Sequence, residues 1–93
     1  MTTMTAGDFE WDSDKAETNA RKHGVSFEEA ATAFEDPAAV LLDDPKYDGR
    51  YWLIGFSVRA RMLLVVHTES GERTRIISAR KAERHEAKLY RSC

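Results

Sequence analysis

The hydrophobic periodicity of the chain changes from helical to strand-like at Ala39, and this change limits the folds open to it. Before it, Phe27, Ala30, Ala31 and Phe34 recur at helical spacing and form a narrow apolar stripe. After it come short runs rich in β-branched and aromatic residues, at 40–42, 50–57, 62–68 and 73–78. Short connections favour antiparallel neighbours, so the pattern predicts an α+β domain with helices packed on an antiparallel meander sheet.

Capping residues, glycines and prolines in the sequence predict where the helices and strands begin and end. Phe9-Glu10-Trp11 alternates as a short strand, and Asp12 or Ser13 can cap a helix that runs to about Lys22 before His23-Gly24 ends it. Ser26 and Glu29 form a capping box for a second helix that ends before Pro37. We expect residues 50–57 to form the central strand, residues 81–91 a C-terminal helix, residues 1–8 a flexible extension and residues 9–93 a single domain.

Composition excludes several classes of protein. The chain has 93 residues and a single cysteine, Cys93, so an internal disulfide or a cysteine-based zinc site cannot form. No stretch approaches the roughly 20 apolar residues that span a bilayer, and Met1–Asp8 lacks the features of a secretory signal. We therefore expect a cytoplasmic protein without a membrane partner.

The charges are segregated along the chain. Residues 1–49 hold 4 basic and 12 acidic side chains, whereas residues 50–93 hold 10 basic and 4 acidic ones. This asymmetry predicts a cationic surface for an anionic partner. A phosphate-binding groove could be formed by Arg59, Arg61, Arg73, Arg75, Arg80, Lys81, Arg84 and Lys88. The competing interpretation of these basic residues is that they lie on solvated faces, where Glu83 and Glu86 pair with nearby cations. The large aromatic residues could either stack on bases or fill the core.

The three histidines have different surroundings in the sequence. His23 lies four residues after Asn19, which could orient its ring, although a helix-capping histidine fits equally. His67 shares a strand face with apolar residues and is expected to be a hydrogen-bonded core or edge imidazole, while His85 lies among solvated charges. No pair has metal-ligand spacing, so neither a metal nor another cofactor is predicted.

Metal-free cleavage of RNA would suit these residue types. The reaction needs a base for the ribose 2′-hydroxyl, cations for the charge on the phosphorane and an acid for the leaving 5′-oxygen. Histidine, arginine and a lysine in a basic cluster can fill these roles. The sequence lacks the motifs of serine hydrolases, P-loop enzymes and dinucleotide-binding enzymes.

Two blocks of sequence resemble a known family. KHGVSFEEA at residues 22–30 and IISARKA at residues 76–82, together with FEWD at 9–12, Asp36-Pro37, Glu86 and Tyr90, are similar to the BrnT family of bacterial toxins. The blocks occur in order, and the resemblance extends from Phe9 to Tyr90.

The resemblance implies a small ribonuclease toxin of a type II toxin–antitoxin pair, with a RelE-like fold. It also implies a hetero-oligomeric complex with a BrnA-type antitoxin. In that complex only the antitoxin would bind operator DNA. Carried onto this chain, it implies catalytic roles for Lys22, His23, Arg61 and Arg80, with support from Asn19 and Glu86. RNA contacts are expected from Arg59, Arg75, Lys81 and Arg84. The alternative is a module that binds RNA or protein without cleaving it.

Overall fold

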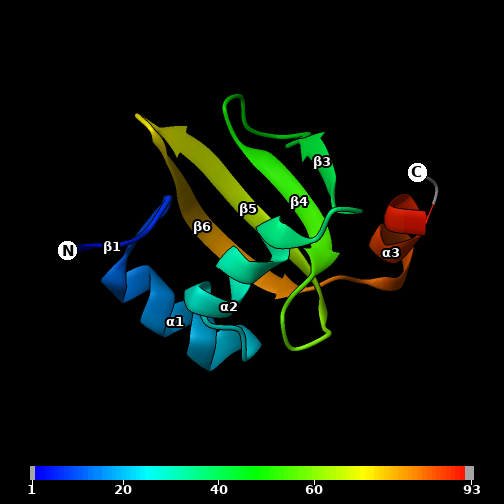
Figure 1. Ribbon diagram of the computed structural model, residues 1–93, viewed down its shortest axis with the longest axis horizontal. Coiled ribbons are helices and arrows are strands. Elements are labelled where there is room, and N and C mark those ends of the chain that lie inside the picture. Colours follow the sequence, from blue (N-terminus) through cyan, green and yellow to red (C-terminus); the bar gives the residue numbers. More distant parts are fainter. Residues whose placement is uncertain (1, 92–93) are drawn as a thin grey trace.

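The computed structural model describes residues 2–91, which form one six-stranded sheet with three α-helices and a 3-10 helix (Figure 1). The prediction of an α+β fold is confirmed. The elements are β1 (Thr3–Ala6), β2 (Phe9–Asp12), α1 (Ser13–His23), α2 (Phe27–Thr32), η1 (Ala33–Glu35), β3 (Val40–Asp43), β4 (Tyr51–Phe56), β5 (Met62–Ser70), β6 (Arg73–Lys81) and α3 (Arg84–Arg91).

The sheet has the order β1-β2-β6-β5-β4-β3. Strands β3 to β6 form the predicted antiparallel meander, whereas β2 pairs with β6 in parallel. The expectation of a purely antiparallel sheet was wrong at β2, because α1, α2 and strands β3 to β5 separate it from β6 along the chain and provide the long crossover that a parallel pair needs. The expectation that residues 50–57 are central was also wrong, since β5 and β6 occupy the middle of the sheet.

Regular structure extends further at both ends of the sheet than predicted. Residues 3–6, expected to belong to a flexible extension, form β1, which pairs with β2 through a turn at Gly7 (φ +60°). All of β1 is exposed, so the strand is held by its pairing with β2 and not by side chains packed on a core. At the other end, β6 continues to Lys81, and α3 therefore begins at Arg84 instead of Lys81. Cys93 lies outside the described residues.

The predicted caps at Asp12 and Ser26 and the predicted stop of the first helix at Gly24 are present. The Asp12 carboxylate accepts from Asp14 N at 2.8 Å, Ser26 Oγ accepts from Glu29 N at 3.0 Å, and Gly24 ends α1 in the left-handed region (φ +68°). The second helix is shorter than expected: α2 ends at Thr32 and gives way to η1. Among the described residues, no helix combines the length and apolarity needed to cross a membrane.

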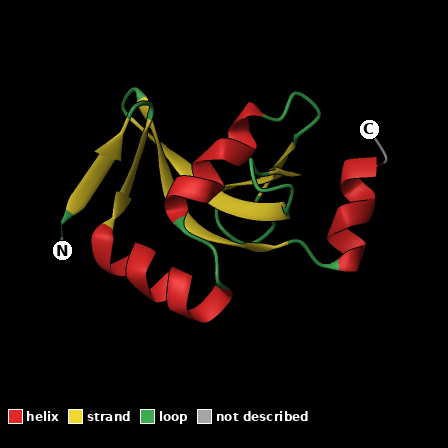
Figure 2. Cartoon of the chain, turned by 60° about the horizontal axis from the view of Figure 1, so that its bottom comes forward, coloured by secondary structure: helices red, strands yellow, loops and turns green. Residues whose placement is uncertain are grey.

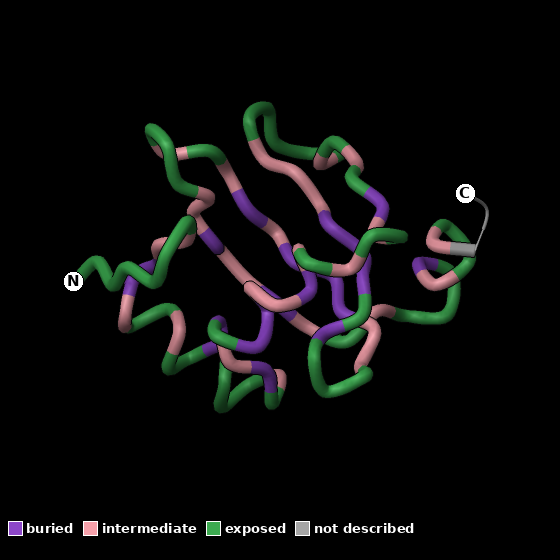
Figure 3. The backbone as a smooth tube through the Cα atoms, in the orientation of Figure 1, coloured by how far each residue is buried: buried purple, intermediate pink, exposed green. Residues whose placement is uncertain are grey.

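The main core lies between the sheet and the helices α1 and α2, which cover one face (Figure 2). It contains Trp11, Phe27, Leu63, Val65 and Ala79, and the rings of Trp11 and Phe27 meet edge to face at 6.0 Å. Trp11 is thus a core residue. Figure 3 shows buried backbone concentrated in the middle of the sheet.

The opposite face carries a second row of buried side chains. Val40, Ile54 and Leu64 occupy neighbouring register positions, and the row ends at Arg80. Helix α3 packs at the end of this face, where the Tyr90 ring meets the Phe56 ring at 5.4 Å. We call the two sides the α1/α2 face and the α3 face.

Candidate active site

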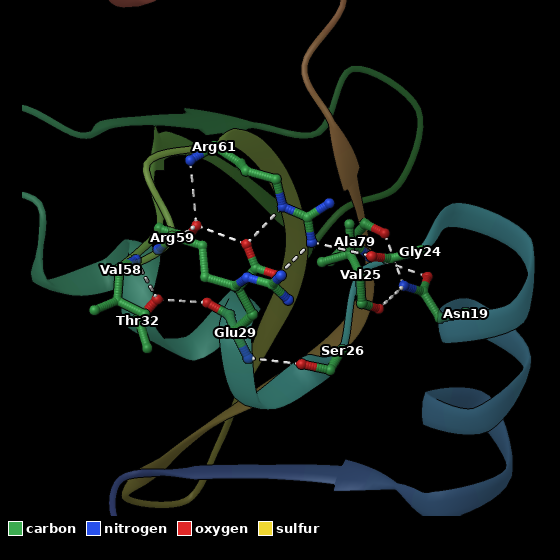
Figure 4. Close-up of polar contacts among 11 residues, drawn as sticks. Asn19, Gly24, Val25, Ser26, Glu29, Thr32, Val58, Arg59, Arg61 and Ala79 are labelled. Atoms are coloured by element: carbon green, nitrogen blue, oxygen red, sulfur yellow. Dashed lines mark hydrogen bonds and ion pairs between the residues drawn. The ribbon is translucent and has the colours of Figure 1, made fainter.

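Arg61 lies just before β5 and is bound to α2 through Glu29 (Figure 4). Its Nε donates to Glu29 Oε2 at 2.9 Å, and its Nη2 forms a short hydrogen bond with Oε1. The Ser57 hydroxyl donates to the same carboxylate at 2.6 Å, and Glu29 is only 6% exposed. A buried carboxylate therefore fixes both the turn between β4 and β5 and the plane of the Arg61 guanidinium.

The same guanidinium reaches the end of α1. Nη2 of Arg61 donates to the carbonyl of Gly24 at 3.0 Å, and Gly24 directly follows His23. This bond joins the basic second half of the chain to the segment that carries Lys22 and His23. Among the residues that the structure describes, none bonds Nη1 of Arg61, so this edge can take a ligand.

The charges here leave a positive excess. The bond to Arg61, ahead of that to Ser57, lowers the pKa of Glu29, while the same pairing raises the pKa of Arg61, so both are ionised at neutral pH. Arg59 is exposed in the same turn, and its charge also lowers the pKa of Glu29. Arg59 and Arg61 thus stand against one buried carboxylate, and exposed Lys22 lies two residues before Gly24 in the chain, which favours an anionic ligand.

A surface pocket of about 370 Å³ lies between α1 and β6. Lys22 and His23 line it with residues from the start of α1 and from β6: Asp12, Asp14, Lys15, Thr18, Asn19, Ile77 and Ser78. The structure thus places two of the predicted catalytic residues, Lys22 and His23, at one pocket and brings Arg61 to the neighbouring Gly24.

Asn19 has a different task from the predicted one. Its Nδ2 donates to Val25 O at 3.0 Å and to Ala79 O at 2.7 Å, and its Oδ1 accepts from Ala79 N at 3.1 Å. Both amide hydrogens are therefore used: the two bonds with Ala79 hold α1 against β6, and the bond to Val25 O holds the loop that follows α1. The expectation that Asn19 orients the His23 ring was wrong, because the backbone of β6 engages its amide group.

Arg80 lies on the other face. Its register partner is Leu64 and its neighbour Ala79 belongs to the main core, so alternation points Arg80 to the α3 face. Its Nη1 and Nη2 donate to Glu86 at 2.8 and 2.7 Å, and Glu86 also accepts from Glu83 N. This pairing raises the pKa of Arg80 and lowers that of Glu86. The structure confirms the possible Arg80–Glu86 pair but separates Arg80 from Arg61.

The predicted RNA-binding residues do not form one groove. Arg75 pairs with Glu10 at 2.6 Å, and at about 3.3 Å per residue it lies about 20 Å along β6 from Lys81. Lys81 has Leu63 as its register partner and so belongs to the α1/α2 face, near Arg59 at the same end of the sheet. Arg84 is exposed at the start of α3. The prediction of a continuous cationic groove is therefore wrong, and only the cations near His23 remain candidates for binding phosphate.

The other histidines stay apart from this region. His67 is buried, with Nδ1 3.2 Å from Val65 O and its ring edge to face with Phe34, as expected for a core imidazole. His85 is exposed, and its ligand atom lies within 4.8 Å of those of Glu83 and Glu86. Glu86 already bonds Arg80 and the Glu83 amide, which reduces its capacity to bind a cation.

Comparison with known proteins gives the family. Residues 11–86 match the family model described as "Ribonuclease toxin, BrnT, of type II toxin-antitoxin system". The chain belongs to the BrnT family. The crystal structure of the Brucella abortus ribonuclease toxin BrnT is similar to it, with 26% identity, a TM-score of 0.63, and coverage of 80% of this chain and 94% of that chain. No curated protein sequence matches the chain.

The fold joins the two blocks that carried the BrnT resemblance. The first block supplies His23, Gly24 and Glu29, the second supplies Ala79 and Arg80, and Asn19 bonds the backbone of both. Sequence reasoning missed Glu29 as a site residue, because Ser26-x-x-Glu29 indicates a capping box. Only half of that box forms: Ser26 caps the helix, while the Glu29 carboxylate binds Arg61 and Ser57.

Proposed function

We propose that this BrnT-family chain is an endoribonuclease toxin of a type II toxin–antitoxin pair that cleaves mRNA without a metal ion. Family membership supports the ribonuclease activity. The observation that carries the choice of site is the hydrogen bond from Arg61 to Gly24 O, which brings a fixed cation beside the segment holding His23.

The chemistry requires only groups of the chain itself. His23 accepts the proton of the ribose 2′-hydroxyl, whose oxygen attacks the neighbouring phosphorus. The free edge of Arg61 binds a non-bridging oxygen as charge develops on it, and Lys22 gives a proton to the leaving 5′-oxygen. The P–O5′ bond breaks, leaving a 2′,3′-cyclic phosphate and a 5′-hydroxyl. Glu29 holds the guanidinium in its plane throughout.

Arg80 takes a different role in this proposal. With both of its Nη atoms on Glu86, it supports α3 and contributes charge to RNA that passes the end of the sheet, as do Lys81 and Arg84. A likeness of the whole fold to RelE-type toxins stays a prediction.

Cleavage of single-stranded RNA in EDTA tests the proposal. Purified chain freed of antitoxin should produce 2′,3′-cyclic phosphate or 3′-phosphate ends, and His23→Ala should stop it without unfolding the protein. Glu17→Ala, an exposed change elsewhere on α1, is the control. If the RNA stays intact from roughly pH 5 to pH 9, the chain is not a ribonuclease, and the alternative is a non-catalytic module that binds RNA or protein. Cleavage that EDTA abolishes would remove the metal-free mechanism.

The partner is proposed to be a BrnA-type antitoxin, acting in the cytoplasm and binding operator DNA on behalf of the complex. The acidic first half of the chain offers one surface for it. Co-expression with a small ribbon-helix-helix protein encoded beside the toxin should yield a stable hetero-oligomer and restore growth. If the toxin is purified from such cells without the second protein, the proposal of this partner is contradicted.

A further inference from the structure

The pocket between α1 and β6 has no role in the chemistry beyond carrying Lys22 and His23 at one end. We propose that it binds one base of the RNA, next to the phosphate that is cleaved, and selects bases bearing an exocyclic amino group over uracil. This inference rests on the proposed function. A volume of about 370 Å³ lies at the lower end of the range for small-ligand sites, as a single base requires.

The charges along the pocket favour a base inside it and a phosphate at its rim. Asp12 and Asp14 lie at the start of α1, and Lys22 and His23 lie at its end, about 12 Å further along at 1.5 Å per residue. Lys15 also lines the pocket there, but two carboxylates against one ammonium leave the first end negative, so it repels phosphate. The cations, with Arg61 bonded to the next residue, attract phosphate to the second.

Several side chains that line the pocket have hydrogen-bonding groups without a partner among the described residues, and Asp14 and Thr18 are two of them. Asp12 accepts from the amides of Asp14 and Lys15, and the amide of Asn19 is bound to β6. By contrast, none of the residues in the described range 2–91 bonds the carboxylate of Asp14 or the hydroxyl of Thr18. A free carboxylate accepts from the amino groups on base edges, whereas the single N3–H of uracil lies between two carbonyl oxygens that repel a carboxylate.

The wall opposite α1 has a local irregularity. Val66 pairs with Ser78 and His67 pairs with Ile76, so Ile77 is an extra residue on β6. Such a bulge re-aims side chains, and Ile77 contributes to the lining of the pocket. An aliphatic side chain beside acceptors suits the flat apolar face of a base.

A matched pair of variants tests the pocket through cleavage. Thr18→Trp fills it, whereas Ala20→Trp adds the same bulk at an exposed position of α1 outside it. Cut sites are mapped on a randomised RNA pool in EDTA. Wild type and Ala20→Trp should disfavour uracil at one position beside the cut by about tenfold or more, and Thr18→Trp should lose this discrimination or all cleavage. Equal base preference in the three proteins would overturn the inference while leaving the ribonuclease intact.

Direct binding separates the inference from the proposed function. The four nucleoside 3′-monophosphates are titrated into the purified chain, and backbone amide shifts are followed by NMR. The guanine, adenine and cytosine nucleotides should shift Thr18, Lys22 and Ile77, the uracil nucleotide should bind more weakly, and Asp14→Ala should remove the difference. Glu17→Ala, which changes a carboxylate outside the pocket, should preserve it. Shifts that are absent, or equal for all four bases, would overturn the base pocket even if RNA is cleaved.

Discussion

The two arginine–glutamate pairs, Arg61–Glu29 and Arg80–Glu86, share their chemistry but lie on opposite faces of the sheet. In each, the carboxylate is buried, at 5% and 3% side-chain exposure, and the arginine reaches the surface at 25% and 34%. Arg61 gives Glu29 its Nε and Nη2, which leaves the Nη1 edge unbonded by the described residues. Arg80 gives Glu86 both Nη atoms, and Glu86 also accepts from the amide of Glu83, just before α3.

This difference separates a cation held ready for a ligand from a cation held in a structural joint. A carboxylate that binds one edge of a guanidinium fixes its plane while the other edge faces outward. A carboxylate that binds both Nη atoms and a helix amide connects strand to helix. The Arg61 pair should therefore govern cleavage, and the Arg80 pair should govern stability.

Removing Arg61 should have the largest effect. Arg61→Ala should lower the cleavage rate about 10²–10³-fold, the loss typical of one lost contact to a developing oxyanion. Arg80→Ala, compared at equal folded fraction, should lose less than about tenfold. Rates on a single-stranded oligoribonucleotide in EDTA measure both. Equal losses would place both arginines in contact with RNA phosphates and move part of the site to the α3 face.

Breaking the Arg80 pair should have the next largest effect, on stability. Arg80→Ala leaves the buried Glu86 carboxylate with only its bond from Glu83 N and should lower the free energy of unfolding by about 2–3 kcal/mol. The double variant Arg80→Met/Glu86→Leu removes both charges and should recover most of this loss and retain cleavage. Urea unfolding measures the stability. A double variant that folds well but cannot cleave RNA would show that the pair does more than join α3 to β6.

Local parts of this comparison could be predicted from the sequence, and non-local parts could not. Arg80 and Glu86 are six residues apart, and their pairing was one of the expected alternatives. Arg61 and Glu29 are separated by 32 positions and meet only because the β4–β5 turn reaches α2. Likewise, Asp12, Ser26 and Gly24 mark the helix ends through local bonds, whereas the parallel pairing of β2 with β6 depends on the assembled sheet.

Acid should weaken both pairs together. Pairing with arginine lowers the pKa of Glu29 and of Glu86 below the usual glutamate value, so the unfolded chain binds more protons than the folded one as the pH falls. Their contribution to stability is complete above about pH 4.5 and is lost as the pH drops through the lowered folded-state values. Arg80→Met/Glu86→Leu should lose less stability than wild type over this range in urea titrations. An unchanged acid slope would show that the Arg80 pair contributes nothing there.

The smallest effect should come from His67, which lies in the core of the Arg61 side. Burial against Phe34 and Tyr51 lowers its pKa, so the folded state keeps the ring neutral while the unfolded state takes up a proton below about pH 6.5. Protonation of the unfolded chain therefore lowers the free energy of unfolding between roughly pH 7 and pH 5, before either glutamate is protonated. His67→Phe keeps a flat ring and should flatten this part of the pH profile, with little change below it. Thermal unfolding across this range measures the difference, and identical profiles would show that the His67 imidazole does not contribute to the loss of stability in mild acid.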